Sequence, residues 1–254
     1  MKQIIPFISQ KIIKTTLVFI LLFGVLLLSL PYGVSMSPYA SSLPFTDVDP
    51  ADWFYEQVRD VFEQGLMTGT GDVTFSPGAQ VTRAMAVQVL YNHSDRPSTT
   101  WMVNPFTDVA ADAWYHDAVV WAATRGIAHG FWEGTFAPGD SITRAHLIVL
   151  LNNYANFARL ELPPQRESQP FADDMDIRNY AKEAIDRFFR AMIINGRPDG
   201  SFDPQGKATR AELATILSQF VRYSETCDEP PPVPPYGVFL APPPAPEYGF
   251  PCSD

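Results

Sequence analysis

The stretch FTDVDPADWFYEQVRDVFEQGLMTG, residues 45–69, decides the fold because the chain repeats its order twice more. FTDVAADAWYHDAVVWAATRGIAHG follows in register at residues 106–130. FADDMDIRNYAKEAIDRFFRAMIING, residues 171–196, carries one extra residue between its acidic start and its aromatic position. Self-similarity at a fixed period indicates a repeat architecture, and units this small bury little apolar surface alone. We therefore predict that the three copies share one core.

Each copy contains two helical patterns and no convincing strand alternation, which predicts a mostly α fold. Along the first helix the apolar residues follow the spacing i, i+3, i+4, i+8, so they lie on one helical face. They are Val58, Val61, Phe62 and Leu66, then Val119, Ala122, Ala123 and Ile127, then Ile185, Phe188, Phe189 and Ile193. Three glycines suit the C-terminal stop of this helix, namely Gly69, Gly130 and Gly196. The second helix follows a threonine N-cap in each copy, at Thr82, Thr143 and Thr209.

An arginine comes directly after each capping threonine, at Arg83, Arg144 and Arg210. A cation in the first turn opposes the positive end of the helix dipole, so the arginine is unfavourable for the helix alone. A carboxylate ligand would complete an anion site with the free N–H groups of that turn, and arginine can hold it in a bidentate way. On this interpretation the ligand-free arginine has no obligatory partner. The alternative is an internal ion pair with a repeat aspartate, namely Asp47, Asp108 or Asp173.

The repeated order F-x-D-V…W…G-[IL]-x-x-G…G-T-F-x-P…[IV]-T-R-A resembles the S-layer homology domain in three tandem copies, from Phe45 to Tyr223. The resemblance implies a pseudo-threefold, three-pronged helical assembly with grooves between adjacent repeats. It implies non-covalent attachment of an exported protein to cell-wall glycans, especially secondary polymers that carry ketal-linked pyruvate. The motif arginine would line those grooves together with neighbouring aromatic and loop residues.

A set of candidate carbohydrate-binding residues follows from the resemblance: Arg83, Arg144, Arg210, Thr82, Thr143, Thr209, Trp53, Trp114, Tyr180, Gly134 and Gly200. The three aromatic residues could stack on a sugar ring or pack beneath the first helix, and both interpretations stay open. The repeat aspartates are better explained as caps or turn formers than as ligand contacts.

The copies differ at positions that matter for binding. Only the third has the full T-R-A-E, in which Glu212 can close a capping box with Thr209. Met85 and His146 replace that glutamate in the other copies, and the first copy has Val73 where the others have glycine. We therefore expect unequal grooves and favour those that contain Arg144 and Arg210.

The ends of the chain differ from the repeats. Lysines and an apolar run predict an export signal over residues 1–35, with an uncleaved anchor as the alternative. We expect a linker at 36–44, repeats at 45–94, 106–157 and 171–223, and a Pro-rich tail at 224–254. The tail holds both cysteines, Cys227 and Cys252, which could form a disulfide or stay free or intermolecular.

Composition and motifs narrow the function. A net charge of −10 disfavours nucleic acid and anionic membrane surfaces, which need broad basic patches. The four histidines do not recur at equivalent repeat positions and show no metal-ligand spacing, and the chain has no G-x-S-x-G or P-loop motif. We expect a non-enzymatic protein of the cell envelope that uses no cofactor or metal and binds a wall polysaccharide. The rival hypothesis is an envelope scaffold whose Pro-rich tail recruits a protein partner.

Overall fold

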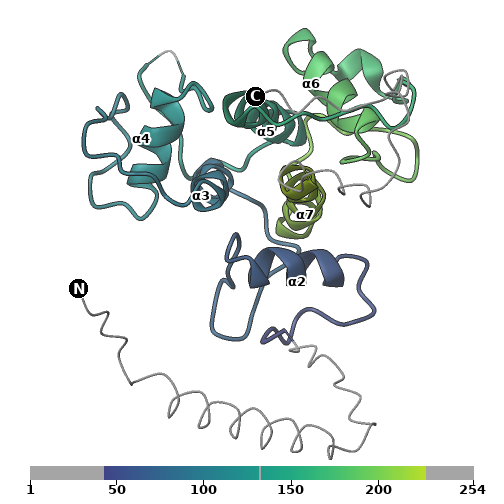
Figure 1. The fold of residues 1–254 in the computed structure, drawn as a ribbon, viewed down its shortest axis with the longest axis horizontal. Helices are drawn as coiled ribbons and strands as arrows, with labels where there is room; N and C mark the ends of the chain where they lie inside the picture. The colour runs from purple at the N-terminus through teal and green to yellow at the C-terminus, as the bar shows by residue number, and fades with distance from the viewer. Residues whose placement is uncertain (1–42, 132, 227–254) are drawn as a thin grey trace, which may run out of the picture. The chain divides into compact units, whose positions relative to one another are not determined.

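The computed structural model describes residues 43–131 and 133–226 of the 254-residue chain. Within these residues it contains six α-helices and one 3-10 turn and no strands: α2 (Tyr55–Glu63), α3 (Arg83–His93), α4 (His116–Thr124), α5 (Arg144–Ala158), η1 (Asp174–Asp176), α6 (Asn179–Arg190) and α7 (Arg210–Thr226) (Figure 1). The mostly α prediction is thus confirmed. None of these helices is long and apolar enough to span a bilayer. The predicted leader, the Pro-rich tail beyond residue 226 and both cysteines lie outside the described residues.

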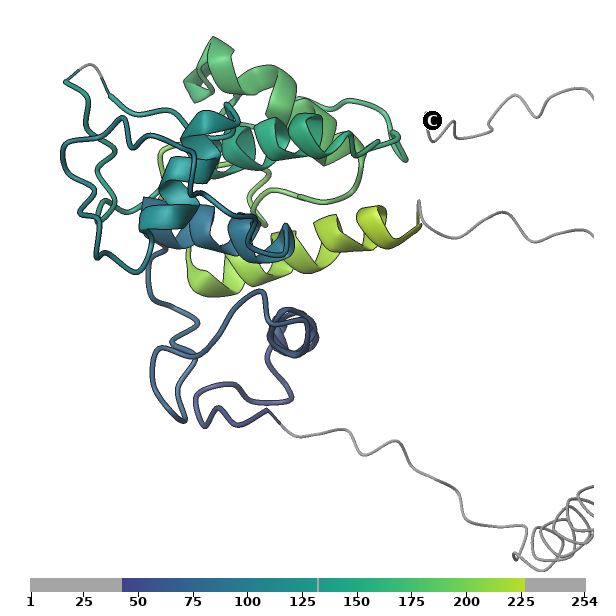
Figure 2. The same cartoon turned by 60° about the vertical axis from the view of Figure 1, so that its left-hand side comes forward.

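The helices pair between repeats in a closed cycle. The first helix of each repeat packs against the second helix of the preceding repeat, as α4 does on α3 and α6 on α5. The first helix of the first repeat, α2, packs on α7, the second helix of the third repeat. Figure 1 shows α3, α5 and α7 near the centre with α2, α4 and α6 outside them, and the turned view of Figure 2 shows α2 end-on beneath α7. This cyclic pairing fits the pseudo-threefold arrangement that the resemblance implies.

A ring of three backbone hydrogen bonds lies where the repeats meet. Val81 N–H donates to the carbonyl of Ala208, Ala208 N–H to that of Ile142, and Ile142 N–H to that of Val81, at 2.9, 3.1 and 2.9 Å. Each of these residues directly precedes the capping threonine of a second helix. The starts of the three second helices are therefore fixed to one another, and one hydrophobic core runs through all three repeats.

The predicted apolar face of the first helix is buried in every repeat, except that Phe62 and Ala123 are only partly buried. The predicted helix stops are wrong. The helices end earlier, at a left-handed residue that is Gly65, Gly126 or Met192, with φ of 68°, 68° and 61°. Gly130 serves another purpose, because a Cβ there would lie 2.3 Å from the Phe106 ring.

Candidate functional site

The threonine before each second helix is the N-cap that the sequence predicts. Its hydroxyl accepts a hydrogen bond from the backbone N–H three residues later, at 3.2 Å in every repeat. The three pairs are Thr82 with Met85, Thr143 with His146, and Thr209 with Glu212. The residue three positions after the threonine is thereby held at the start of the helix.

Each motif arginine crosses into the next repeat. Its Nε donates to a phenylalanine carbonyl oxygen at 2.7–2.8 Å, and its guanidinium lies over the same ring, 4.4–5.0 Å from the centroid. The pairs are Arg83 with Phe136, Arg144 with Phe202, and Arg210 with Phe75. The arginine that is unfavourable for its own helix thus fastens two repeats together. This contact explains its position without a ligand.

The repeat aspartate holds the other side of the same phenylalanine turn. Its two carboxylate oxygens accept the backbone N–H groups of the phenylalanine and of the next residue, at 2.7–2.8 Å. That next residue is left-handed in each repeat, as at Ala137 with φ of 53°. Burial opposes ionisation of Asp47, but the N–H groups of Phe75 and Ser76 outweigh it and lower the pKa of Asp47. The aspartates are therefore turn formers, as expected.

The arginines do not pair directly with these aspartates among the described residues; they meet them through the shared turn. Their outer nitrogens also have protein partners. Arg83 donates to the His129 carbonyl at 2.8 Å, and Arg210 donates to the Thr68 carbonyl at 2.6 Å. The expectation that the ligand-free arginine has no partner is wrong. The expectation of free N–H groups in the first turn is wrong too, because the arginine and the alanine after it donate theirs to backbone carbonyls of the next repeat. Burial lowers the pKa of all three guanidinium groups, which nevertheless stay charged.

Two grooves open beside these arginines. The Arg210 groove, of about 350 Å³, is lined by Arg210 of the third repeat, residues 66–70 and α3 of the first, and Trp114 of the second. The Arg83 groove, of about 190 Å³, is lined by Arg83 of the first repeat together with residues 127–131 and α5 of the second. Tyr180 of the third repeat stacks on His146 in the wall of this groove, with 5.4 Å between the ring centroids. Side chains of all three repeats thus lie in or against the wall of each groove.

The aromatic candidates lie outside the core. Trp53, Trp114 and Tyr180 are 65%, 62% and 48% exposed, so the interpretation that they pack beneath the first helix is wrong. The glycine candidates serve a turn instead. Gly134 and Gly200 are left-handed, with φ of 68° and 82°, and their carbonyl oxygens each accept a backbone N–H from the start of the repeat.

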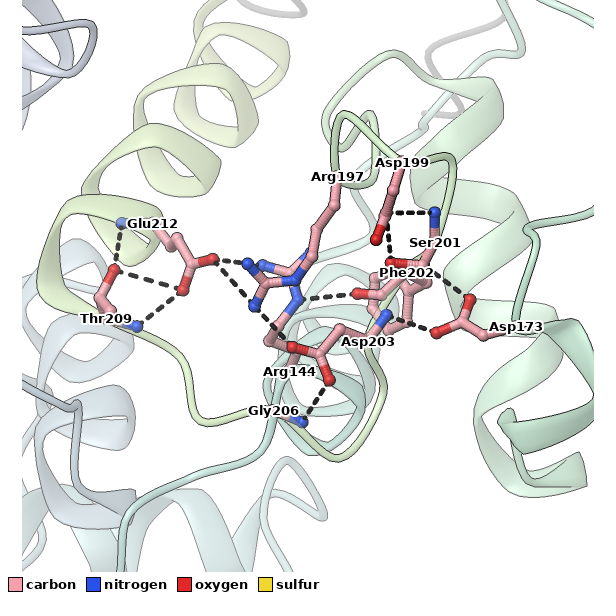
Figure 3. A network of polar contacts seen from close by, with 10 residues as sticks. All are labelled: Arg144, Asp173, Arg197, Asp199, Ser201, Phe202, Asp203, Gly206, Thr209 and Glu212. Carbon is pink, nitrogen blue, oxygen red and sulfur yellow. Dashed lines mark hydrogen bonds and ion pairs between the residues drawn. The ribbon is translucent and has the colours of Figure 1, made fainter.

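The surroundings of Arg144 differ from both grooves (Figure 3). Its Nη1 forms an ion pair with Glu212 Oε1 at 2.7 Å. The other oxygen of Glu212 accepts the backbone N–H of Thr209 at 2.8 Å, which confirms the capping box. Arg197 adds a second cation, 2.6 Å from Asp203 and 3.9 Å from Glu212.

Arg197 and Phe131 are site residues that sequence reasoning missed. Phe131 lines the Arg83 groove, where its ring centroid lies 4.9 Å from the Arg83 guanidinium. Both residues come directly after a repeat glycine, Gly130 or Gly196, and the first repeat has Thr70 there, which lines the Arg210 groove. The position after the repeat glycine is therefore the sequence signal that could have pointed to them.

Comparison with known proteins agrees with this architecture. The model of the S-layer homology domain matches residues 44–86, 105–148 and 174–214. Similar curated proteins include an endoglucanase of Bacillus sp. (strain KSM-635), 28% identical over 70% of this chain and 19% of its own length, and the surface-layer 125 kDa protein of Lysinibacillus sphaericus, 26% identical over 77% and 16%. The S-layer protein sap of Bacillus anthracis is 31% identical over 44% of this chain and 13% of its own length. The chain thus spans less than a fifth of the length of these relatives.

Proposed function

The chain belongs to the S-layer homology domain family, and on that premise we propose that its three repeats attach it non-covalently to the bacterial cell wall by binding a wall polysaccharide. The observation that carries the proposal is the composition of the Arg210 groove. A buried guanidinium, a backbone turn and an exposed tryptophan from three different repeats meet in one concave site. The proposal places the protein outside the cytoplasm and assigns no catalytic step to the repeats.

The groove chemistry favours a glycan that carries a carboxylate, such as a polymer with ketal-linked pyruvate. Arg210 has five N–H donors, and the contacts to Phe75 and Thr68 use two of them. The remaining donors suit a carboxylate oxygen, and charge-assisted hydrogen bonds of this kind are the stronger ones. The chain as a whole carries a net charge of −10, so an anionic glycan needs this local cation.

Neighbouring groups suit the sugar itself. Trp114 offers an exposed aromatic face in the Arg210 groove, and apolar faces of sugar rings pack well on aromatic rings. Gln88 lines the same groove, and its buried Oε1 has no hydrogen-bond partner among the described residues. A sugar hydroxyl donating to that oxygen would satisfy it, since a buried acceptor without a partner is costly. By the cyclic relation between repeats, Tyr180 serves the Arg83 groove and Trp53 the Arg144 site.

Binding is tested by sedimentation of the protein with purified wall material, before and after chemical removal of its pyruvyl groups. We expect co-sedimentation that weakens when those groups are removed. Trp114→Ala should reduce wall binding about tenfold, while the matched variant Trp101→Ala should not. Trp101 is also an exposed tryptophan, at 94%, and it does not line the Arg210 groove. Equal binding by wild type and Trp114→Ala would contradict the proposed site.

The Pro-rich tail supports the second candidate, an envelope scaffold that recruits a partner while the repeats tether it. PPPVPPYG and APPPAPEYG in residues 230–249 have the composition of ligands for aromatic grooves. Deleting residues 227–254 leaves α7 complete, so wall binding should survive. A protein that co-purifies with the full chain and is lost with this deletion would support the scaffold role.

A further inference from the structure

One position of each repeat differs in charge although its backbone is held in the same way. Three residues after the capping threonine stand Met85, His146 and Glu212, each with its N–H on the threonine hydroxyl. Met85 lines the Arg210 groove and His146 lines the Arg83 groove, so this position faces the groove in both. We call it the cap+3 position.

At the Arg144 site the cap+3 residue already supplies a carboxylate. Glu212 Oε1 lies 2.7 Å from Arg144 Nη1 and 3.9 Å from Arg197 Nη2. Figure 3 shows both ion pairs as dashed lines. The side chains of Arg144 and Glu212 are only 11% and 19% exposed, so water screens the pair little. The capping bond of Oε2 to Thr209 holds the glutamate in place from its other end.

The other two arginines have neutral outer partners. Within residues 43–131 and 133–226, Arg83 and Arg210 give their outer N–H groups to backbone carbonyls and form no direct ion pair. Aspartates act on them only at longer range. Their positive charge is therefore left for an incoming anion, while that of Arg144 is neutralised in direct contact.

We propose that the cap+3 residue decides whether a groove accepts an acidic glycan, and that Glu212 closes the Arg144 site by acting as a built-in carboxylate. The inference rests on the proposed function. A ligand carboxylate at Arg144 must break a buried, charge-assisted bond and then lie beside the displaced carboxylate of Glu212. Neither cost arises beside Met85 or His146. The chain therefore binds acidic glycan at two sites, not three, and the expected preference for the Arg144 and Arg210 grooves gives way to Arg83 and Arg210.

The experiment counts sites by titration calorimetry with a synthetic disaccharide that carries a ketal-linked pyruvate. We expect two sites per wild-type chain and three for Glu212→Gln. Glutamine keeps an oxygen that can accept the Thr209 N–H, so the capping contact can survive while the carboxylate is lost. Thermal melting of the same samples confirms that each is folded.

The reciprocal variant installs the carboxylate. Met85→Glu should weaken binding at the Arg210 groove at least tenfold relative to Met85→Gln, which has the same size without the charge. This arm remains informative if Glu212→Gln does not fold. Three sites in the wild type, two in a folded Glu212→Gln, or equal binding by Met85→Glu and Met85→Gln would overturn the role of the cap+3 residue. Failure of the proposed function looks different, because the wild type would then bind no probe at all.

Discussion

The Arg210 and Arg144 sites are alike on the inner side of the guanidinium, where Nε lies, and unlike on its outer side, where the Nη atoms lie. On the inner side, Nε donates to a phenylalanine carbonyl, and an aspartate of the same repeat as that phenylalanine holds its N–H. On the outer side, Arg210 meets the neutral carbonyl of Thr68 and Arg144 meets the carboxylate of Glu212. Both sides thus join two repeats, but the inner contacts are the same at both sites, whereas the outer partner differs. Differences in binding are therefore expected on the outer side.

The largest expected effect is the loss of unfolding free energy when the phenylalanine of an inner contact is truncated. It tests whether the three inner contacts contribute equally to stability. Phe75, Phe136 and Phe202 are at most 1% exposed, and truncating a buried phenylalanine to alanine costs about 3–5 kcal/mol of unfolding free energy. We expect similar costs for Phe75→Ala, Phe136→Ala and Phe202→Ala, each in one calorimetric transition, because the three repeats share one core. Separate transitions for individual repeats would show that they fold independently and that the inner contacts are not shared.

The arginine itself gives the next largest effect. Arg210 is 7% exposed and donates to two carbonyl oxygens, and hydrogen bonds to charged groups contribute about 1.5–3 kcal/mol each. Arg210→Lys keeps the charge but cannot reproduce both contacts, so it should lower the unfolding free energy by about 3 kcal/mol in chemical denaturation. Arg125→Lys is the control, since Arg125 is exposed and lies outside both grooves. An unchanged denaturation midpoint in Arg210→Lys would mean that the arginine is held for a ligand alone.

The sequence predicted the repeats, their helices and the threonine caps because these depend on local periodicity and on contacts within a few residues. It also placed Thr209 and Glu212 in one capping box, which the structure confirms. It could not predict that the arginine reaches a carbonyl oxygen in the next repeat. Every residue has a backbone carbonyl, so the residue type does not show which one accepts the hydrogen bond. The second use of Glu212, on Arg144, was hidden for a different reason: the two residues are 68 positions apart, so no local pattern connects them.

A smaller effect is expected at the helix ends, where sequence reasoning chose the wrong glycines. Met192 adopts a left-handed conformation with φ of 61°, which costs a non-glycine residue about 1–2 kcal/mol. Its side chain is 48% exposed, so little packing is lost on removal. Met192→Gly should raise the unfolding free energy by up to about 1 kcal/mol, after the entropy that glycine adds to the unfolded chain. Gly126→Ala, at φ of 68° in the second repeat, is the matched change and should lower it by a similar amount.

The smallest effect is a pH dependence of stability. It arises from His146, the cap+3 residue of the Arg83 groove, and the Arg210 groove has Met85 at that position. Burial is the largest cause of the lowered pKa of His146, and nearby cations add to it, namely Arg83, Lys207 and Arg178. Because the folded pKa lies below the unfolded value of about 6.5, the unfolded chain binds the proton first, and stability declines as pH falls through and below that value. His146→Gln should remove this part of the decline in denaturation measured between pH 7.5 and pH 5.5.

The affinity for the ligand should also depend on pH through His146, but in the opposite direction to stability. A glycan carboxylate in the Arg83 groove offsets the surrounding cations and favours the imidazolium form of His146, so binding there takes up protons and strengthens as pH falls. The Arg210 groove has Met85 at this position and no such group, so its affinity should change little over the same interval. Calorimetry of the pyruvylated disaccharide should therefore resolve one pH-dependent site and one pH-independent site, and His146→Gln should leave both flat. Two sites with the same pH profile would show that the cap+3 residue does not reach the ligand.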